Sequence, residues 1–264
     1  MAGHSKWATT KRHKAAQDKK RSALFGKLSR AIFVAAKNGD PNPDNNAALA
    51  AAIAKAKSYS LPKDNIATAI AKASGAANDG ASWDEIIYEG YGPAGVAVYI
   101  ECLTDNRNRA AADVRAAFTK VGGNLGTSGS VAFQFQRKGE IVVELSHLKG
   151  LSGQGSTFCE DEFMLEVADA GGSDYQLVED NKEPIAVVTT EATALMAVKA
   201  ALESQGHMVR GAELMMEAVN PQTVDISDAK KVMALIDRLE DLDDVQNVYH
   251  TMELSEEQLE QLDS

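Results

Sequence analysis

A stretch rich in glycine, alanine, asparagine and serine at residues 74–82 constrains the fold of this chain more than any other feature. Before it, apolar side chains recur every three or four residues, which predicts helices over 22–37, 44–57 and 62–74. Asp44 suits the N-cap of the second helix. Because three short alanine-rich helices bury little individually, we expect them to form a small antiparallel domain ahead of the linker.

Beyond the linker, strand patterns alternate with helix patterns. Strands are predicted at 96–100, 130–135, 141–145, 185–188, 214–218 and 245–252, and helices at 110–121, 160–170, 192–204 and 229–239. The expected fold class is α+β. An N-terminal three-helix domain is followed by two α+β domains, the last inserted in a ferredoxin-like split βαβ domain. The expected boundaries are 1–79 for the basic arm and helical domain, 80–136 plus 211–254 for the central domain, 137–210 for the inserted domain, and 255–264 for an acidic tail.

Charge is distributed very unevenly along the chain. Residues 1–37 carry ten Lys or Arg and one acid, Asp18, which gives +9. The remainder carries 17 basic and 37 acidic side chains, which gives −20, and the two parts sum to the net charge of −11. Only the first segment therefore has an electrostatic reason to approach nucleic acid. The alternative is that this segment is a solubilising tail.

Two groups of residues are candidates for contact with nucleic acid. In the basic arm, residues 3–21, the basic side chains would neutralise phosphates. Trp7 would either stack on an unpaired base or anchor the arm to the helical domain. The candidate arm cations are Lys6, Lys11, Arg12, Lys14, Lys20 and Arg21. Further on, Arg107 and Arg109 flank the start of a helix that Asp105, Asn106 or Asn108 can cap. This second pair would either form a rigid capped turn with nearby acids or face a phosphate or a partner.

Signatures of several other protein classes are missing from the sequence. No run of 18 apolar residues is present, and the N-terminus lacks the apolar core of a secretory signal. Cys102 and Cys159 match no metal or redox spacing, and neither a phosphate-binding loop nor an HExxH helix occurs. We therefore expect a cytoplasmic protein without catalytic residues, cofactor, metal, small-molecule substrate or membrane contact.

Several runs of sequence resemble the YebC family of bacterial and mitochondrial regulators of gene expression. They are AGHSKW at 2–7, KAAQD at 14–18, LPKDNI at 61–66, YEGYGP at 88–93, CLTDNRNR at 102–109 and GGNLG at 122–126. The resemblance implies three domains, a cytoplasmic setting and no established enzymatic activity. It also implies regulation of transcription through DNA binding or, as for some members of the family, action on the ribosome that helps translation. The chain departs from the family pattern at Thr68, where a basic residue is common, and in the glycine-containing loop 146–158, which is longer than is typical of the family.

Three functions are consistent with these observations. The first is a DNA-binding transcriptional regulator. The second is a ribosome-associated translation factor whose arm and Trp7 contact ribosomal RNA. It is favoured because no helix-turn-helix recognition helix with Arg, Asn or Gln at base-reading positions is evident, and because the helices of segment 44–74 are mostly alanine. The third is a protein-interaction scaffold with an incidental basic tail.

Overall fold

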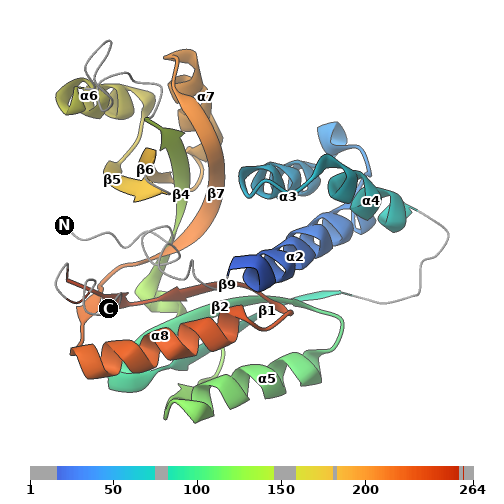
Figure 1. Cartoon of the computed structure of the whole chain (residues 1–264), viewed down its shortest axis with the longest axis vertical. Coiled ribbons are helices and arrows are strands. Elements are labelled where there is room, and N and C mark those ends of the chain that lie inside the picture. Colours follow the sequence, from blue (N-terminus) through green and yellow to red (C-terminus); the bar gives the residue numbers. More distant parts are fainter. Residues whose placement is uncertain (1–16, 75–82, 146–158, 181–182, 256–257, 259–264) are drawn as a thin grey trace. The chain divides into compact units, whose positions relative to one another are not determined.

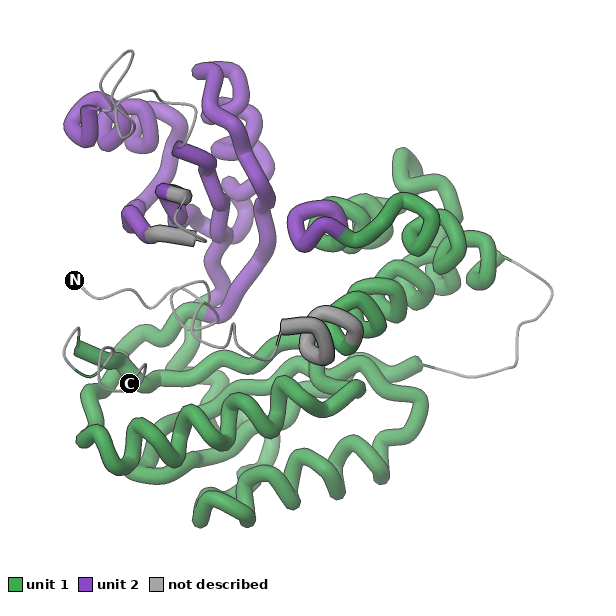
Figure 2. The backbone as a smooth tube through the Cα atoms, in the orientation of Figure 1, with its two compact units in different colours: residues 1–56, 61–136, 217–264 green, residues 57–60, 137–216 purple. Residues whose placement is uncertain are grey.

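The structure is a computed structural model, and it describes residues 17–74, 83–145, 159–180, 183–255 and 258. Contacts divide the chain into two compact units. The first comprises residues 1–56, 61–136 and 217–264, and the second comprises 57–60 and 137–216 (Figures 1 and 2).

The helical part of the first unit consists of α2 (Gln17–Lys37), α3 (Ala47–Ser58) and α4 (Lys63–Ser74), with a 3₁₀ turn at Pro43–Asn45. Each helix turns a small apolar face inward, including Ile32 of α2, Leu49 of α3 and Ile66 of α4. The predicted N-cap at Asp44 is wrong. Asp44 belongs to the 3₁₀ turn, and Asn46 accepts a hydrogen bond from the backbone N–H of Leu49 at 3.1 Å. The second helix therefore begins after Asn46.

A four-stranded sheet forms the centre of the first unit. Its strands β1 (Asp84–Tyr91), β2 (Ala97–Thr104), β3 (Asn124–Leu125) and β9 (Val245–His250) lie in the order β3-β1-β2-β9, and each neighbouring pair is antiparallel. Because β1 lies between β2 and β3, the segment β2–α5–β3 is a split βαβ unit. Short strands β8 (Gln222–Thr223) and β10 (Met252–Glu253) pair in parallel beside it.

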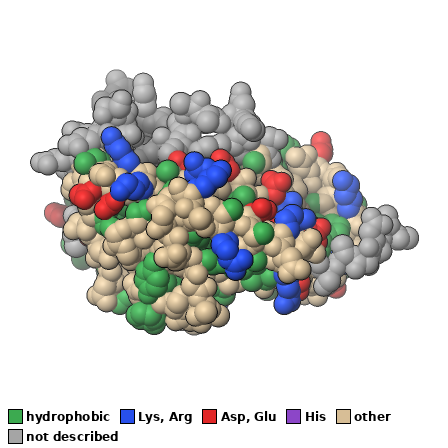
Figure 3. Space-filling model, turned by 90° about the horizontal axis from the view of Figure 1, so that it is seen from below, with side chains coloured by type: hydrophobic (Ala, Val, Ile, Leu, Met, Phe, Trp, Pro, Cys, Tyr) green, Lys and Arg blue, Asp and Glu red, His purple; other side chains and the backbone are tan. Residues whose placement is uncertain are grey.

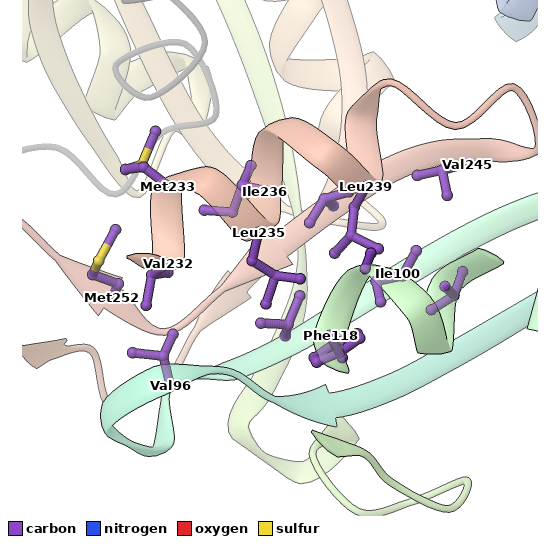
Figure 4. Close-up of a cluster of buried hydrophobic side chains, with 14 of the residues drawn as sticks. Val96, Ile100, Phe118, Val232, Met233, Leu235, Ile236, Leu239, Val245 and Met252 are labelled. Atoms are coloured by element: carbon purple, nitrogen blue, oxygen red, sulfur yellow. The ribbon is translucent and has the colours of Figure 1, made fainter. Parts of the chain in front are cut away.

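Helices α5 (Arg107–Lys120) and α8 (Ile226–Glu240) cover the same face of this sheet (Figure 1). The core lies between them and the strands. Phe118 of α5, Leu235 and Leu239 of α8, and Ile100 of β2 are each 0% exposed (Figure 4). This cluster joins residues about 150 positions apart in sequence, which makes the region one packed body.

The second unit is built around another four-stranded sheet. Its strands β4 (Phe135–Glu144), β5 (Asp174–Asp180), β6 (Glu183–Glu191) and β7 (Met208–Ala218) lie in the order β5-β6-β4-β7. Helices α6 (Glu160–Ala170) and α7 (Leu195–Ser204) contribute Phe163 and Leu202 to a core with apolar residues of the strands.

The expected fold class is confirmed, since an N-terminal helical region precedes two sheet-containing parts. Two predicted strands are wrong in detail. The strand predicted at 214–218 is part of β7 and lies beside β4 in the second sheet, not in the sheet that contains β9. A strand pattern identifies a strand, but it does not identify the neighbour with which the strand pairs.

The strand predicted at 130–135 is a loop up to Gln134, with a 3₁₀ turn at Ala132–Gln134, and Phe135 begins β4. Its alternating Val131 and Phe133 suggest one buried face, yet Val131 is 0% and Phe133 is 74% exposed. The backbone N–H groups of Gly129, Val131 and Ala132 donate to the carboxylate of Glu89 at 2.6–2.8 Å. These N–H groups point to one side chain, so the segment cannot use them in a strand ladder.

Candidate nucleic-acid interface

The predicted arm residues lie largely outside the region that the structure describes. Lys6, Trp7, Lys11, Arg12 and Lys14 precede the first described residue, Gln17. Lys20 and Arg21 fall within the first turns of α2. The contact of these side chains with nucleic acid therefore stays a prediction from charge.

The start of α5 is a rigid capped turn. Asn106 is the N-cap, and its Oδ1 accepts a hydrogen bond from the backbone N–H of Arg109 at 3.1 Å. The backbone N–H of Asn106 in turn donates to Thr104 Oγ1 at 3.0 Å. These bonds join the end of β2 to the first turn of α5, so the structure selects Asn106 from the three candidate caps.

Arg107 and Arg109 both pair with acids near this turn. Arg107 makes a two-point ion pair with Asp84, from Nε at 2.8 Å and from Nη2 at 2.9 Å. Hydrogen bonding to Arg107 lowers the pKa of Asp84. Arg109 Nη2 lies 2.8 Å from Asp105 Oδ1 and 2.9 Å from Asp244 Oδ2.

These ion pairs are the ones that the capped-turn interpretation requires. The side chain of Arg107 nevertheless remains 68% exposed and that of Arg109 48% exposed. Contact between their exposed edges and a phosphate stays a prediction.

Asp244 is a buried carboxylate shared by several elements. The residue is 7% exposed. Its Oδ2 lies 3.0 Å from Thr104 Oγ1 at the end of β2, and its Oδ1 lies 3.5 Å from Arg30 Nη1 of α2. The acidic run at 240–244 has the composition of solvated or helix-end charges, and Asp244 is buried all the same. Its partners come from positions 30, 104 and 109, which no local pattern connects.

Two cations of α2 that the sequence analysis did not single out contact the central region. Lys27 is 9% exposed and donates to the carbonyl oxygen of Glu240, the last residue of α8. Burial lowers the pKa of Lys27, although nearby acids act in the opposite direction. One turn later, Arg30 donates to the carbonyl oxygen of Asp243 at 2.6 Å, and its guanidinium carbon lies 5.1 Å from the centre of the Trp83 ring. Their spacing of three residues on one helix face was the available sequence signal.

The outer surface of α5 and α8 offers scattered cations. Four of them are exposed and make no ion pair with a described residue: Arg115, Lys120, Lys230 and Arg238. Figure 3 shows Lys and Arg side chains spread singly over the face seen from below, with acidic side chains among them. This described surface is therefore a weaker site for a polyanion than a continuous basic stripe would be.

Within the described ranges, no helix is both long and apolar enough to cross a membrane. In the same ranges, His, Cys, Asp and Glu side chains form no group that could hold a metal ion.

Comparison with known proteins gives consistent similarity over the whole chain. The family model described as the TACO1/YebC second and third domain matches residues 83–252, and the TACO1/YebC protein N-terminal domain matches residues 5–76. A relative from Bifidobacterium animalis subsp. lactis is 50% identical over 263 residues, which covers 100% of this chain and 99% of the relative. A relative from Rubrobacter xylanophilus is 48% identical over 257 residues, which covers 97% of both chains. Both are named "probable transcriptional regulatory protein".

One solved structure is also similar. The crystal structure of a conserved hypothetical protein from Aquifex aeolicus superposes with a TM-score of 0.79 at 38% sequence identity. The superposition covers 96% of this chain and 98% of that chain.

Proposed function

The chain belongs to the TACO1/YebC family, and on that premise we propose that it regulates gene expression by binding DNA through its basic N-terminal segment. The names of its relatives support a regulator of gene expression. The observation that carries DNA binding is the division of charge into +9 over residues 1–37 and −20 over the rest. The acidic part repels a polyanion, so the contact is assigned to the basic segment.

The contacts of α2 narrow this basic segment. Of its ten cations, Lys27 and Arg30 are engaged with the central region. Lys37 lies over the ring of Phe33 at 5.9 Å. The cations assigned to phosphate therefore lie before Lys27, and they include the six arm cations predicted from the sequence. Lys and Arg in such a segment add affinity by releasing counterions, without reading bases.

Binding, not catalysis, is the proposed mode of action, in a cytoplasmic setting where nucleic acid is accessible. No residue is assigned a catalytic role, and no cofactor or small-molecule substrate enters the proposal. Where the target presents an unpaired base, as single-stranded DNA or an RNA loop does, Trp7 is assigned the stacking role.

Ribosomal RNA is the second candidate target. The observation in its favour is the composition of α3 and α4: of their 24 residues, 11 are alanine, and the nine polar ones are Lys, Asp, Asn, Ser or Thr. Neither helix carries an Arg or a Gln. A helix of this kind is poorly suited to reading base edges in the major groove of DNA.

Cross-linking followed by sequencing of the bound nucleic acid separates the two targets. Enrichment of promoter DNA supports the proposed function, and enrichment of ribosomal RNA alone replaces DNA with the second candidate. Recovery of neither nucleic acid above a mock control would contradict both.

The role of the arm is tested by salt dependence. Neutralising two arm cations with Lys11→Gln and Arg12→Gln should reduce the log–log slope of affinity against salt by about 1.8 on duplex DNA, at about 0.9 for each phosphate contact. The matched control is Arg115→Gln with Lys120→Gln, which removes the same charge from α5 and should leave the slope unchanged. Equal slopes in the two double variants would remove the arm from the proposal.

A further inference from the structure

Helix α2 is attached to the central region by a small set of polar contacts. Lys27 donates to the carbonyl oxygen of Glu240, and Arg30 donates to that of Asp243 at 2.6 Å. Arg30 also lies over the Trp83 ring at 5.1 Å and faces the carboxylate of Asp244 at 3.5 Å. These four contacts fix the part of α2 that immediately follows the basic arm.

Asp244 is the most constrained partner in this set. Its backbone carbonyl oxygen accepts a hydrogen bond from the N–H of Leu103 at 2.8 Å, which ties it to β2. Its side chain is 8% exposed and lies between Arg30 of α2 and Arg109 of α5. Thr104 occupies a further side of the carboxylate at 3.0 Å. One buried anion therefore compensates two guanidinium groups from separate helices.

We propose that Asp244 is a positioning residue for nucleic-acid binding: by holding Arg30 against the central region, it fixes the place and direction from which the basic arm leaves the body. The inference rests on the proposed function, in which the arm contacts phosphates.

The distribution of charge explains why the origin of the arm matters. The chain beyond residue 37 carries −20. An arm that pivots freely on such a body brings the bound phosphates close to acidic surface in many orientations. It also loses more conformational freedom when it binds. When α2 is already held against the central region, both the repulsion by acidic surface and the loss of conformational freedom on binding are smaller.

The test compares Asp244→Asn with Asp84→Asn in the full chain, using a duplex DNA oligonucleotide and a ribosomal RNA fragment as probes. Asp84 makes a two-point pair with Arg107 within the central region. Each substitution removes one negative charge and releases an arginine, so electrostatics alone predicts a slight gain in affinity for both. We expect Asp244→Asn instead to raise Kd about threefold to tenfold, the scale of ordering one or two side chains on binding. Asp84→Asn should not weaken binding.

Hydrogen exchange supplies a readout of position that does not depend on binding. Amides of α2 from Leu24 to Ala36 should exchange faster in Asp244→Asn than in Asp84→Asn. Addition of the better-binding probe should restore part of the protection. All measurements are made well below the melting temperature of each variant, so that loss of folded protein does not contribute to Kd.

Arg30→Gln provides a second variant that leaves Asp244 paired with Arg109 and Thr104. It should reproduce the loss of affinity, whereas Arg115→Gln, which removes the same charge from an exposed position, should have a smaller effect. This pair keeps the test decisive if Asp244→Asn does not fold.

Deletion of residues 2–21 separates the two levels of inference. If the deletion leaves affinity unchanged, the proposed function of the arm fails. If the deletion weakens binding but the Asp244 and Arg30 variants behave like their controls, the positioning role alone is overturned. We expect the deletion to weaken binding and Asp244→Asn to have no further effect in the deleted chain.

Discussion

At the scale of single residues, Glu89 determines the path of the chain between Gly126 and Gln134. Its carboxylate accepts three backbone hydrogen bonds although the residue is only 4% exposed. Burial acts to raise the pKa of Glu89, and the three N–H donors together outweigh it, so that its pKa lies below the usual value. The ionised form is therefore the one that holds the loop.

Glu89→Gln tests this interpretation through stability. The amide presents an NH₂ group where two acceptor oxygens are needed, so we expect a loss of about 1.5–3 kcal/mol in the free energy of unfolding at pH 7. Chemical denaturation measures it. Glu101→Gln, at a half-buried carboxylate that accepts from Asn247 Nδ2, is a control with fewer donors and should cost less.

The same carboxylate should contribute to the dependence of stability on pH. Because its folded pKa is depressed, the unfolded chain binds more protons, and stability rises with pH across this window. The contribution is complete above the unfolded pKa of about 4.3 and is lost as pH falls through the lower folded value. Unfolding measured from neutral to acidic pH should show a shallower acid loss in Glu89→Gln. Parallel curves for the two proteins would contradict the assignment.

Val131 and Phe133 differ in exposure, although an alternating pattern would place both on the same face of a strand. Val131 is 0% and Phe133 is 74% exposed, although both are apolar and two positions apart. Phe133→Ser should therefore change the free energy of unfolding by less than about 0.5 kcal/mol, as is usual for exposed positions. Val131→Ala should cost about 1–3 kcal/mol, because it removes buried methyl groups. Equal effects would mean that the loop packs Phe133 against the body in solution.

At the scale of elements, the end of α5 depends on a close approach of backbone segments. Gly122 has φ +79°, and the N–H of Gly123 donates to the carbonyl oxygen of Phe118 at 2.9 Å, which closes the helix. A Cβ at Gly123 would lie 2.7 Å from the carbonyl oxygen of Tyr91. Gly122 and Gly123 therefore serve the backbone geometry at this helix end.

Alanine at two glycines should have opposite effects on stability. Gly123→Ala should destabilise the protein by about 1–3 kcal/mol, since strand β1 must move away from the new methyl group. Gly26→Ala should stabilise it by about 0.5–1 kcal/mol, because Gly26 lies inside α2 and a Cβ there meets nothing within 4 Å. Thermal or chemical unfolding measures both. A destabilised Gly26→Ala would show that α2 needs flexibility at this position.

Local signals predicted most helices well and strand pairing poorly. Asn106 begins α5 and Gly122 ends it, and both effects act within a few residues, so the sequence displays them. Strand β1 was not predicted, because Asp84, Glu85 and Glu89 interrupt its apolar alternation. Those acids are tolerated because Asp84 pairs with Arg107 and Glu89 binds the loop, and such partners are 23 and about 40 positions away.

At the scale of the whole molecule, the structure places Lys27 and Arg30 of the basic segment in contact with the central region. The sequence predicted the segment from its charge, but it did not distinguish Lys27 and Arg30 from the arm. That distinction depends on Glu240, Asp243 and Asp244, which lie more than 200 positions away. Arg107 and Arg109 were predicted as candidates from a turn pattern that left pairing with nearby acids as one alternative, and the structure shows acids at one edge of each guanidinium.

The acidic side chains beyond residue 37 should weaken the binding of DNA by electrostatic repulsion, and salt should reduce this repulsion. Residues 255–264 carry four acids, Glu256, Glu257, Glu260 and Asp263. Replacing them with Gln and Asn should lower Kd for duplex DNA at low salt. The gain should shrink as salt rises, because exposed charges are screened beyond about 10 Å at 0.1 M ionic strength. Substitution of Asp228 and Asp237 on α8 is a second variant, which removes two acids from the described surface. If neither change alters Kd at low salt, the body does not repel the bound nucleic acid, and the cost assigned to a freely pivoting arm loses its electrostatic part.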